Sequence, residues 1–250
     1  MAFSIIDLAI LVIVAFVPSV IYVVWIRNTE RFNKEPYGRL LRVFVYGATF
    51  SIILAVLLET FVLYLYKMNF GRVYELLGNN PNFETILLAC VIAPFVEEAT
   101  KTIGVLGQRR FMREIEDGIV YGAAAGLGFS ATENLLYEGT PLLQGDTTLF
   151  ISIAVVRILS SSLLHASASA VSGLGIARKI RQGRSWLPYY LTAVIMHSLF
   201  NFGASLGILY GDQLGNSADL AGLMMAFIVA FIGISVVRGK IRSLDRGLAR

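Results

Sequence analysis

The chain has 250 residues, of which 56% are hydrophobic and only 15% are charged, and its mean hydropathy is +0.69. A soluble domain would carry about 25% charged residues, so this composition indicates an integral membrane protein. The net charge of +4 does not indicate nucleic-acid binding, because the basic residues lie in the connections between apolar segments. The single cysteine, Cys90, excludes an intrachain disulfide.

Seven apolar segments are long enough to cross about 30 Å of hydrocarbon as helices. We expect the first to be a retained span rather than a cleaved signal peptide, because no basic region precedes it. Only helices or closed barrels satisfy their backbone in a bilayer, so residues 1–250 are predicted to form a single, all-α, polytopic membrane domain. The predicted spans are residues 4–26, 43–66, 85–107, 118–138, 149–176, 187–209 and 220–237.

The basic residues alternate between the two sides of these spans. Of the 21 lysines and arginines, 17 lie in one set of connections and in the C-terminal tail, whereas the opposite set holds only Lys67 and Arg72. The basic side is cytoplasmic by the positive-inside rule. The predicted topology therefore places the N-terminus outside and the C-terminus in the cytoplasm, in a multi-pass protein of the cell membrane.

Small residues recur at four-residue spacing in three of the predicted spans. This spacing lets helix backbones approach closely in a membrane, so we interpret these positions as helix-packing faces. They are Gly118, Gly122 and Gly126, then Ala166, Ser169, Ala170 and Gly173, and finally Gly203, Gly207 and Gly211.

Two adjacent glutamates, Glu97 and Glu98, lie in an apolar segment, and Lys101 follows them on the same helix. A charge at the centre of a bilayer costs about 3 kcal/mol on insertion scales, so such groups are paired or functional. Lys101 neutralises one acid across a helical turn, which leaves the other available as a general base. Pro94 lacks an N–H and leaves a backbone carbonyl unpaired, a feature that predicts a kinked, cavity-lining helix.

Both histidines of the chain also lie at membrane depth. Arg157 and His165 are two turns apart in the fifth span, and His197 and Asn201 are one turn apart in the sixth. A lone buried histidine is usually structural, but two of them near unpaired glutamates indicate chemistry.

Four segments together resemble the motifs of PrsW-type intramembrane proteases, which are related to the CAAX-protease superfamily. Residues 97–101 resemble the E-E-x-x-K motif, and residues 129–134 resemble F-x-x-x-E-N, with Phe129 and Glu133 at its defined positions. Arg157 with His165 is similar to the third motif, and residues 197–201 are similar to H-x-x-x-N. The Lys-Glu-Pro sequence at residues 34–36 also resembles a family feature.

The resemblance implies an intramembrane endopeptidase that cleaves other membrane proteins. Its typical substrates are single-span anti-sigma factors, cut on the outer side as the first step of regulated proteolysis in stress signalling. The implied partners are a membrane-protein substrate and the lipid bilayer.

In the favoured hypothesis this protease uses glutamate and no cofactor. Glu97, with Glu98, activates water for attack on the scissile carbonyl. His197 and Asn201 bind the oxyanion, and His165 positions the water or protonates the leaving amine.

Four further residues complete this hypothesis. Glu133 orients a histidine or the water and counts among the catalytic residues. Lys101 and Arg157 balance the charge of the acids, and Phe129 supports the site.

Two alternatives use the same residues. A zinc-dependent protease would bind the ion through His165, His197, Glu97 and Glu133, although the helical H-E-x-x-H signature is absent. A proton-coupled transporter would use the buried groups as a relay, but the sequence shows no inverted repeat of the kind common in transporters.

Overall fold

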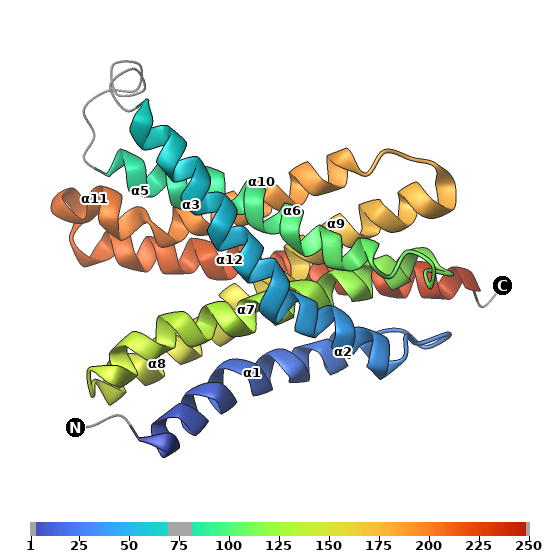
Figure 1. Cartoon of the computed structure of the whole chain (residues 1–250), viewed down its shortest axis with the longest axis horizontal. Helices are drawn as coiled ribbons and strands as arrows, with labels where there is room; N and C mark the ends of the chain where they lie inside the picture. The colour runs from blue at the N-terminus through green and yellow to red at the C-terminus, as the bar shows by residue number, and fades with distance from the viewer. Residues whose placement is uncertain (1–3, 70–81, 249–250) are drawn as a thin grey trace.

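The computed structural model describes residues 4–69 and 82–248 (Figure 1). Within these ranges the chain is helical and contains no strand, which confirms the predicted all-α class. Arg72 and Arg250, which contributed to the topology prediction, lie outside the described residues.

The described residues form seven long helical segments that run back and forth along one bundle (Figure 1). Some of the segments contain a π-helical turn, η1 or η2, or a break between two helices. In chain order they are α1 (Ile5–Arg27); α2 (Tyr37–Tyr46), η1 (Gly47–Ser51) and α3 (Ile52–Met68); α5 (Phe83–Leu87), η2 (Leu88–Ile92) and α6 (Ala93–Leu106); α7 (Ile115–Leu143); α8 (Thr147–Leu159) and α9 (Ser161–Gln182); α10 (Leu187–Ala204) and α11 (Leu206–Leu214); and α12 (Asn216–Leu248).

Five of these segments are long and apolar enough to cross a membrane on length and composition. The other two, α5–α6 and α7, carry the buried acids, which lower their hydropathy. In α7 every residue from Glu116 to Ala131 is buried, because other helices surround it. Seven spans and their orientation therefore stay a prediction, and the termini lie at opposite ends of the bundle (Figure 1).

Helices α7 and α9 pack with their backbones in close contact, as the small-residue spacing predicted. A Cβ atom at Gly122 would overlap the Ser169 carbonyl oxygen, and one at Gly126 would overlap that of His165. These close contacts therefore fix the position of His165 along α7. In the third predicted face, Gly207 lies against α12, whereas Gly211 faces open space.

The connection that holds the Lys-Glu-Pro sequence is tied to the bundle through Glu35. The Tyr121 hydroxyl on α7 donates to the Glu35 carboxylate, and Arg27 donates to its carbonyl oxygen at 2.6 Å. Asp245 on α12 accepts from the backbone N–H groups of Arg31 and Phe32, each at 3.1 Å. This connection therefore joins α1, α7 and α12 at the end of the bundle that holds most of the basic residues.

Glu30 lies buried in the same connection, and one of its carboxylate oxygens has no hydrogen-bond partner. Burial, helped by the negative charge of Asp117, raises the pKa of the Glu30 carboxyl to about 8. The folded protein therefore holds a proton on Glu30 at neutral pH.

Replacement of Gly122 by leucine should separate α7 from α9, because its Cβ would overlap the Ser169 backbone. We expect the unfolding midpoint in detergent to fall by about 10 °C or more, as overpacking of several kcal/mol implies. The matched control is Gly239→Leu on α12, where nothing lies within 4 Å of the new Cβ. Equal midpoints for both variants would contradict this packing.

Replacement of Glu30 by glutamine should stabilise the protein at alkaline pH. The folded-state pKa of about 8 exceeds the ordinary value of 4.5, so the folded state binds the extra proton. Wild-type stability is then full at low pH and falls as pH rises from about 4.5 to about 8. Between about pH 5 and pH 8.5 the difference in unfolding midpoint between Glu30→Gln and the wild type should change by about 3 °C or more. Glu114→Gln is the control. Midpoint–pH curves of Glu30→Gln and wild type that run parallel would refute the assignment.

Candidate active site

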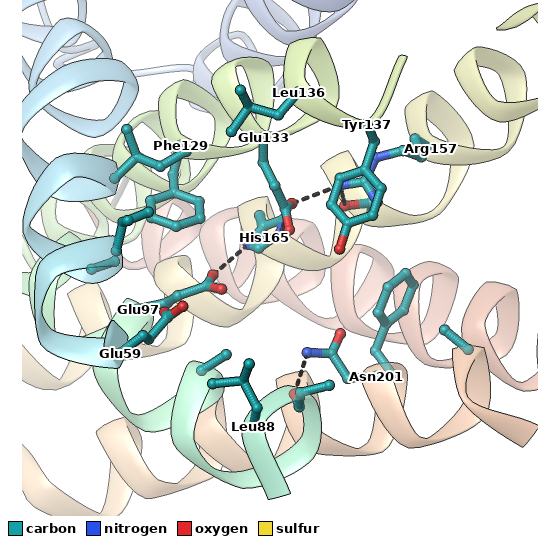
Figure 2. A pocket seen from close by; sticks show the side chains of 18 of the residues that line it. Glu59, Leu88, Glu97, Phe129, Glu133, Leu136, Tyr137, Arg157, His165 and Asn201 are labelled. Atoms are coloured by element: carbon teal, nitrogen blue, oxygen red, sulfur yellow. Dashed lines mark hydrogen bonds and ion pairs between the residues drawn. The ribbon is translucent and has the colours of Figure 1, made fainter. Parts of the chain in front are cut away.

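A cavity of about 490 Å³ lies among α3, η2, α6, α7, α8–α9 and α10–α11 (Figure 2). Four of the six predicted catalytic residues line it, together with the predicted supporting residues Phe129 and Arg157. The other two, Glu98 and His197, are buried beside these side chains and do not line the cavity. The four that line it are Glu97, Glu133, His165 and Asn201.

Lys101 lies at the centre of the polar network with only 1% of its surface exposed. Its ammonium nitrogen lies 2.9 Å from Glu97 Oε2, 2.9 Å from Glu98 Oε1 and 2.8 Å from His165 Nδ1. An ammonium group has three donors and no acceptor, so these three partners satisfy it completely. The Phe129 ring, whose centre is 4.1 Å from the ammonium nitrogen, covers its remaining side.

The ammonium group determines which nitrogen of His165 carries the proton. Because Lys101 can only donate, Nδ1 of His165 accepts, and the neutral ring must carry its proton on Nε2. That Nε2–H group donates to Glu133 Oε2 at 2.9 Å, and Arg157 Nη2 donates to the same oxygen at 2.7 Å. Figure 2 shows this row of side chains along the cavity wall.

Glu98 has both carboxylate oxygens engaged. Oε1 accepts from Lys101 and lies 3.2 Å from His197 Nδ1, while Oε2 accepts from the Ser169 hydroxyl at 3.0 Å. The ring proton of neutral His197 is therefore on Nδ1, and its Nε2 lone pair lies 3.9 Å from Glu97 Oε2. Glu98 positions Lys101 and His197, and it is fully buried and does not line the cavity.

Glu97 differs from Glu98 in facing the cavity. Its Oε2 accepts from Lys101, whereas its Oε1 makes no hydrogen bond within the described residues. Of the two adjacent glutamates, Glu97 is therefore the one that lines the cavity and has an oxygen without a hydrogen bond within the described residues.

Asn201 lies beside the backbone carbonyl that Pro94 leaves unpaired at the η2–α6 junction. In η2 the Ala93 N–H donates to the Leu88 carbonyl, and Pro94 has no N–H to offer the next one, Ala89. The Asn201 side-chain nitrogen donates to this Ala89 carbonyl at 2.7 Å. The second hydrogen of the amide remains for another acceptor at the cavity wall.

Two polar side chains at the cavity, Glu59 and Tyr137, were not among the site residues assigned from the sequence. Glu59 on α3, which the sequence left unassigned, lines the cavity beside Glu97 (Figure 2). Tyr137 on α7 stacks its ring 4.0 Å from the Arg157 guanidinium. Glu59 shares a helix face with Ile52 and Val56, which also line the cavity, and this spacing was the sequence signal that could have placed it there.

Glu97, His165 and His197 also form a group that suits a metal ion. One ligand atom from each lies within 4.8 Å of the others, and two imidazoles with a carboxylate are a donor set that zinc accepts. Neutral His197 already presents a bare Nε2, whereas both ring nitrogens of His165 are engaged by Lys101 and Glu133. The residues therefore fit zinc in chemistry, provided that His165 gives up one contact; Glu133 lies outside the group.

The carboxylates and histidines form a polar cavity among apolar helices, an arrangement that suits an intramembrane enzyme. The model of the PrsW family, described as intramembrane metalloproteases, matches residues 35–234, so the chain belongs to that family of intramembrane proteases. Protease PrsW of Clostridioides difficile (strain 630) is 27% identical over 202 residues, which cover 77% of this chain and 78% of the relative. Protease PrsW of Geobacillus kaustophilus (strain HTA426) is 28% identical over 186 residues, covering 71% and 74%. No solved structure matches the chain.

Replacement of Lys101 by methionine should destabilise the protein, because two buried carboxylates lose their cation. Breaking a buried ion pair costs about 3–5 kcal/mol, which corresponds to a fall of about 10 °C in the unfolding midpoint. Adding Glu98→Gln to this variant should restore part of the loss, because it removes one unpaired charge. The control is Lys179→Met, at a lysine near the end of α9 that makes no ion pair within the described residues; additive losses in the double variant would refute the network.

Proposed function

We propose that the chain hydrolyses peptide bonds of membrane-protein substrates, with Glu97 as the general base. The observation that carries this proposal is the free Glu97 Oε1 at the cavity wall, opposite an Oε2 held by Lys101. A base must reach the proton that it removes within about 3 Å. Water that enters the cavity would reach Glu97, which lines it, and not Glu98, which is fully buried outside the lining.

In the proposed reaction, water attacks the scissile carbonyl carbon while Glu97 Oε1 takes one of its protons. The tetrahedral intermediate then breaks at the C–N bond, and Glu97 returns that proton to the leaving amine. Neither ring nitrogen of His165 is free to take a proton or to bind water, so in this arrangement His165 acts by holding Lys101 and Glu133 in place. Glu133 and Arg157 hold the His165 ring in this orientation.

The oxyanion of the intermediate requires hydrogen-bond donors. Asn201 supplies the unused hydrogen of its side-chain amide, at the position where it already lines the cavity. Such donors typically contribute about 3 kcal/mol to the transition state. The ring N–H of neutral His197 is directed to Glu98 and is therefore not available to the oxyanion. His197 contributes indirectly, by holding Glu98 in place.

A zinc-dependent form of the reaction stays a second candidate, because the grouping of Glu97, His165 and His197 favours it. Those three residues would hold the ion, and zinc supplies an acidified water and a Lewis acid for the carbonyl. Lys101 already places one positive charge 2.9 Å from Glu97 and 2.8 Å from His165, which supports the metal-free form.

The cavity walls support a membrane-embedded substrate. Apolar side chains of α3, η2 and α11, such as Val56, Leu88 and Ile208, make up much of the lining. We propose single-span proteins as substrates, with anti-sigma factors of the cell membrane as the class that the family resemblance suggests. Cleavage would follow from the outer side of the membrane.

The test is cleavage of a panel of single-span membrane substrates by the purified chain in proteoliposomes. Glu97→Gln should reduce the cleavage rate about 10²–10⁴-fold, which is the usual contribution of a general base. Its unfolding midpoint should stay near that of the wild type, because the amide oxygen of the new side chain can still accept from Lys101. Glu59→Gln, which changes a neighbouring carboxyl, is the matched control and should retain most activity.

The same cleavage assay with a zinc chelator distinguishes the metal-free glutamate reaction from the zinc-dependent one. Cleavage that survives zinc chelation in metal-free buffer supports the glutamate reaction, and cleavage that is lost and then restored by added zinc supports the zinc reaction. An active Glu97→Gln variant would contradict both forms.

A further inference from the structure

A second cavity, of about 420 Å³, lies between α1, the α8–α9 junction and α12. Its apolar wall includes Leu159, Leu163 and Phe231, and its other end holds two arginines, Arg238 and Arg242. The catalytic cavity shares none of these residues. The groove is therefore a separate feature with an apolar and a basic end.

The two arginines lack anionic partners. Neither Arg238 nor Arg242 makes an ion pair among residues 4–69 and 82–248. Arg238 donates to the Thr29 hydroxyl at 3.0 Å, and its guanidinium stacks 3.8 Å from the Trp25 ring. Asp245, the acid nearest to them along α12, accepts from two backbone N–H groups of the first connection. Two adjacent guanidinium groups with no acid against them complement a bound anion.

The groove has the dimensions of half a bilayer. Phe231 and Arg242 lie on α12 about 16 Å apart along the helix axis at 1.5 Å per residue, and half of the hydrocarbon core is about 15 Å thick. Trp25 and Tyr22, both in the groove wall, are amphipathic side chains of the type enriched at membrane interfaces. The apolar end thus lies at mid-membrane depth when the basic end lies at the headgroup level.

We propose that this groove binds an anionic phospholipid from the basic side of the membrane. The phosphate lies between Arg238 and Arg242, and an acyl chain lies against Leu159, Leu163 and Phe231. Basic pockets between membrane helices on the cytoplasmic side bind such headgroups. The groove supplies both the charge and the apolar surface for this ligand.

Lipid in this groove would contact the helix break that positions the active site. Leu159 and Leu163 lie on either side of Ser160, where α8 ends and α9 begins, and they face the groove. Arg157 and His165, from the same two helices, face the catalytic cavity. A bound lipid should therefore stabilise the junction, a result that can be measured without any cleavage assay.

The test uses the full chain in phosphatidylcholine nanodiscs that contain increasing fractions of phosphatidylglycerol. Lipid retained by the protein after detergent extraction is counted by native mass spectrometry, and the unfolding midpoint is recorded. The wild type should retain phosphatidylglycerol saturably over phosphatidylcholine, with a rising midpoint. Arg242→Gln should weaken retention several-fold, and Arg238→Gln with Arg242→Gln about tenfold or more.

Two further variants keep the result interpretable if loss of the Arg238–Trp25 contact weakens folding. Ser235→Trp fills the groove and leaves both arginines in place, so it should also lower retention. Arg184→Gln removes an exposed arginine at the α9–α10 connection and should leave retention unchanged. Retention that is equal in all variants would overturn the proposal. So would an unaffected Ser235→Trp variant with full competition by inorganic phosphate, which would identify a free-phosphate site instead.

Discussion

The buried ammonium group of Lys101 is the constraint on which the rest of the site depends. With almost no exposed surface and three donors to satisfy, it requires three acceptors in fixed directions. Glu97, Glu98 and His165 provide them from α6 and α9. From this one interaction follow the Nε2–H tautomer of His165 and its bond to Glu133. Removing water around such charges strengthens each contact.

The helical framework brings these groups to one depth by close packing and by local departures from α-helical geometry. Glycines of α7 lie against α9 and bring His165 toward Glu133. The π-helical turn η2 and Pro94 leave the Ala89 carbonyl for Asn201, which joins α10 to the same wall. Such π-helical turns are frequent at functional sites. Rigid contacts of this kind hold the cavity side chains in the fixed orientations that a catalytic site requires.

The residues around this cavity could be predicted from the sequence, because charged residues are rare in apolar segments and are retained there only when they are paired or functional. All nine residues assigned from the sequence lie in one connected group around the cavity. The sequence hypothesis named Glu97 as the base, but the residues alone gave no physical reason to prefer it to Glu98, because adjacent residues differ by about 100° around a helix and η2 shifts the register. Glu59 stayed unassigned because it is the only acid in its predicted span and the sequence showed no partner for it. The break at Ser160 has no glycine or proline to mark it, so the fifth span read as one continuous helix.

The most direct test of the Lys101 network is nitrogen-15 solid-state NMR of histidine-labelled protein in liposomes at mildly alkaline pH. The chain has only two histidines, so His197→Gln assigns both sets of signals. The network predicts opposite neutral tautomers, with the proton on Nε2 in His165 and on Nδ1 in His197. It also predicts that Lys101→Met abolishes the fixed Nε2–H tautomer of His165. A proton on Nδ1 of His165 in the wild type would contradict the account, because Lys101 could not then donate to that nitrogen.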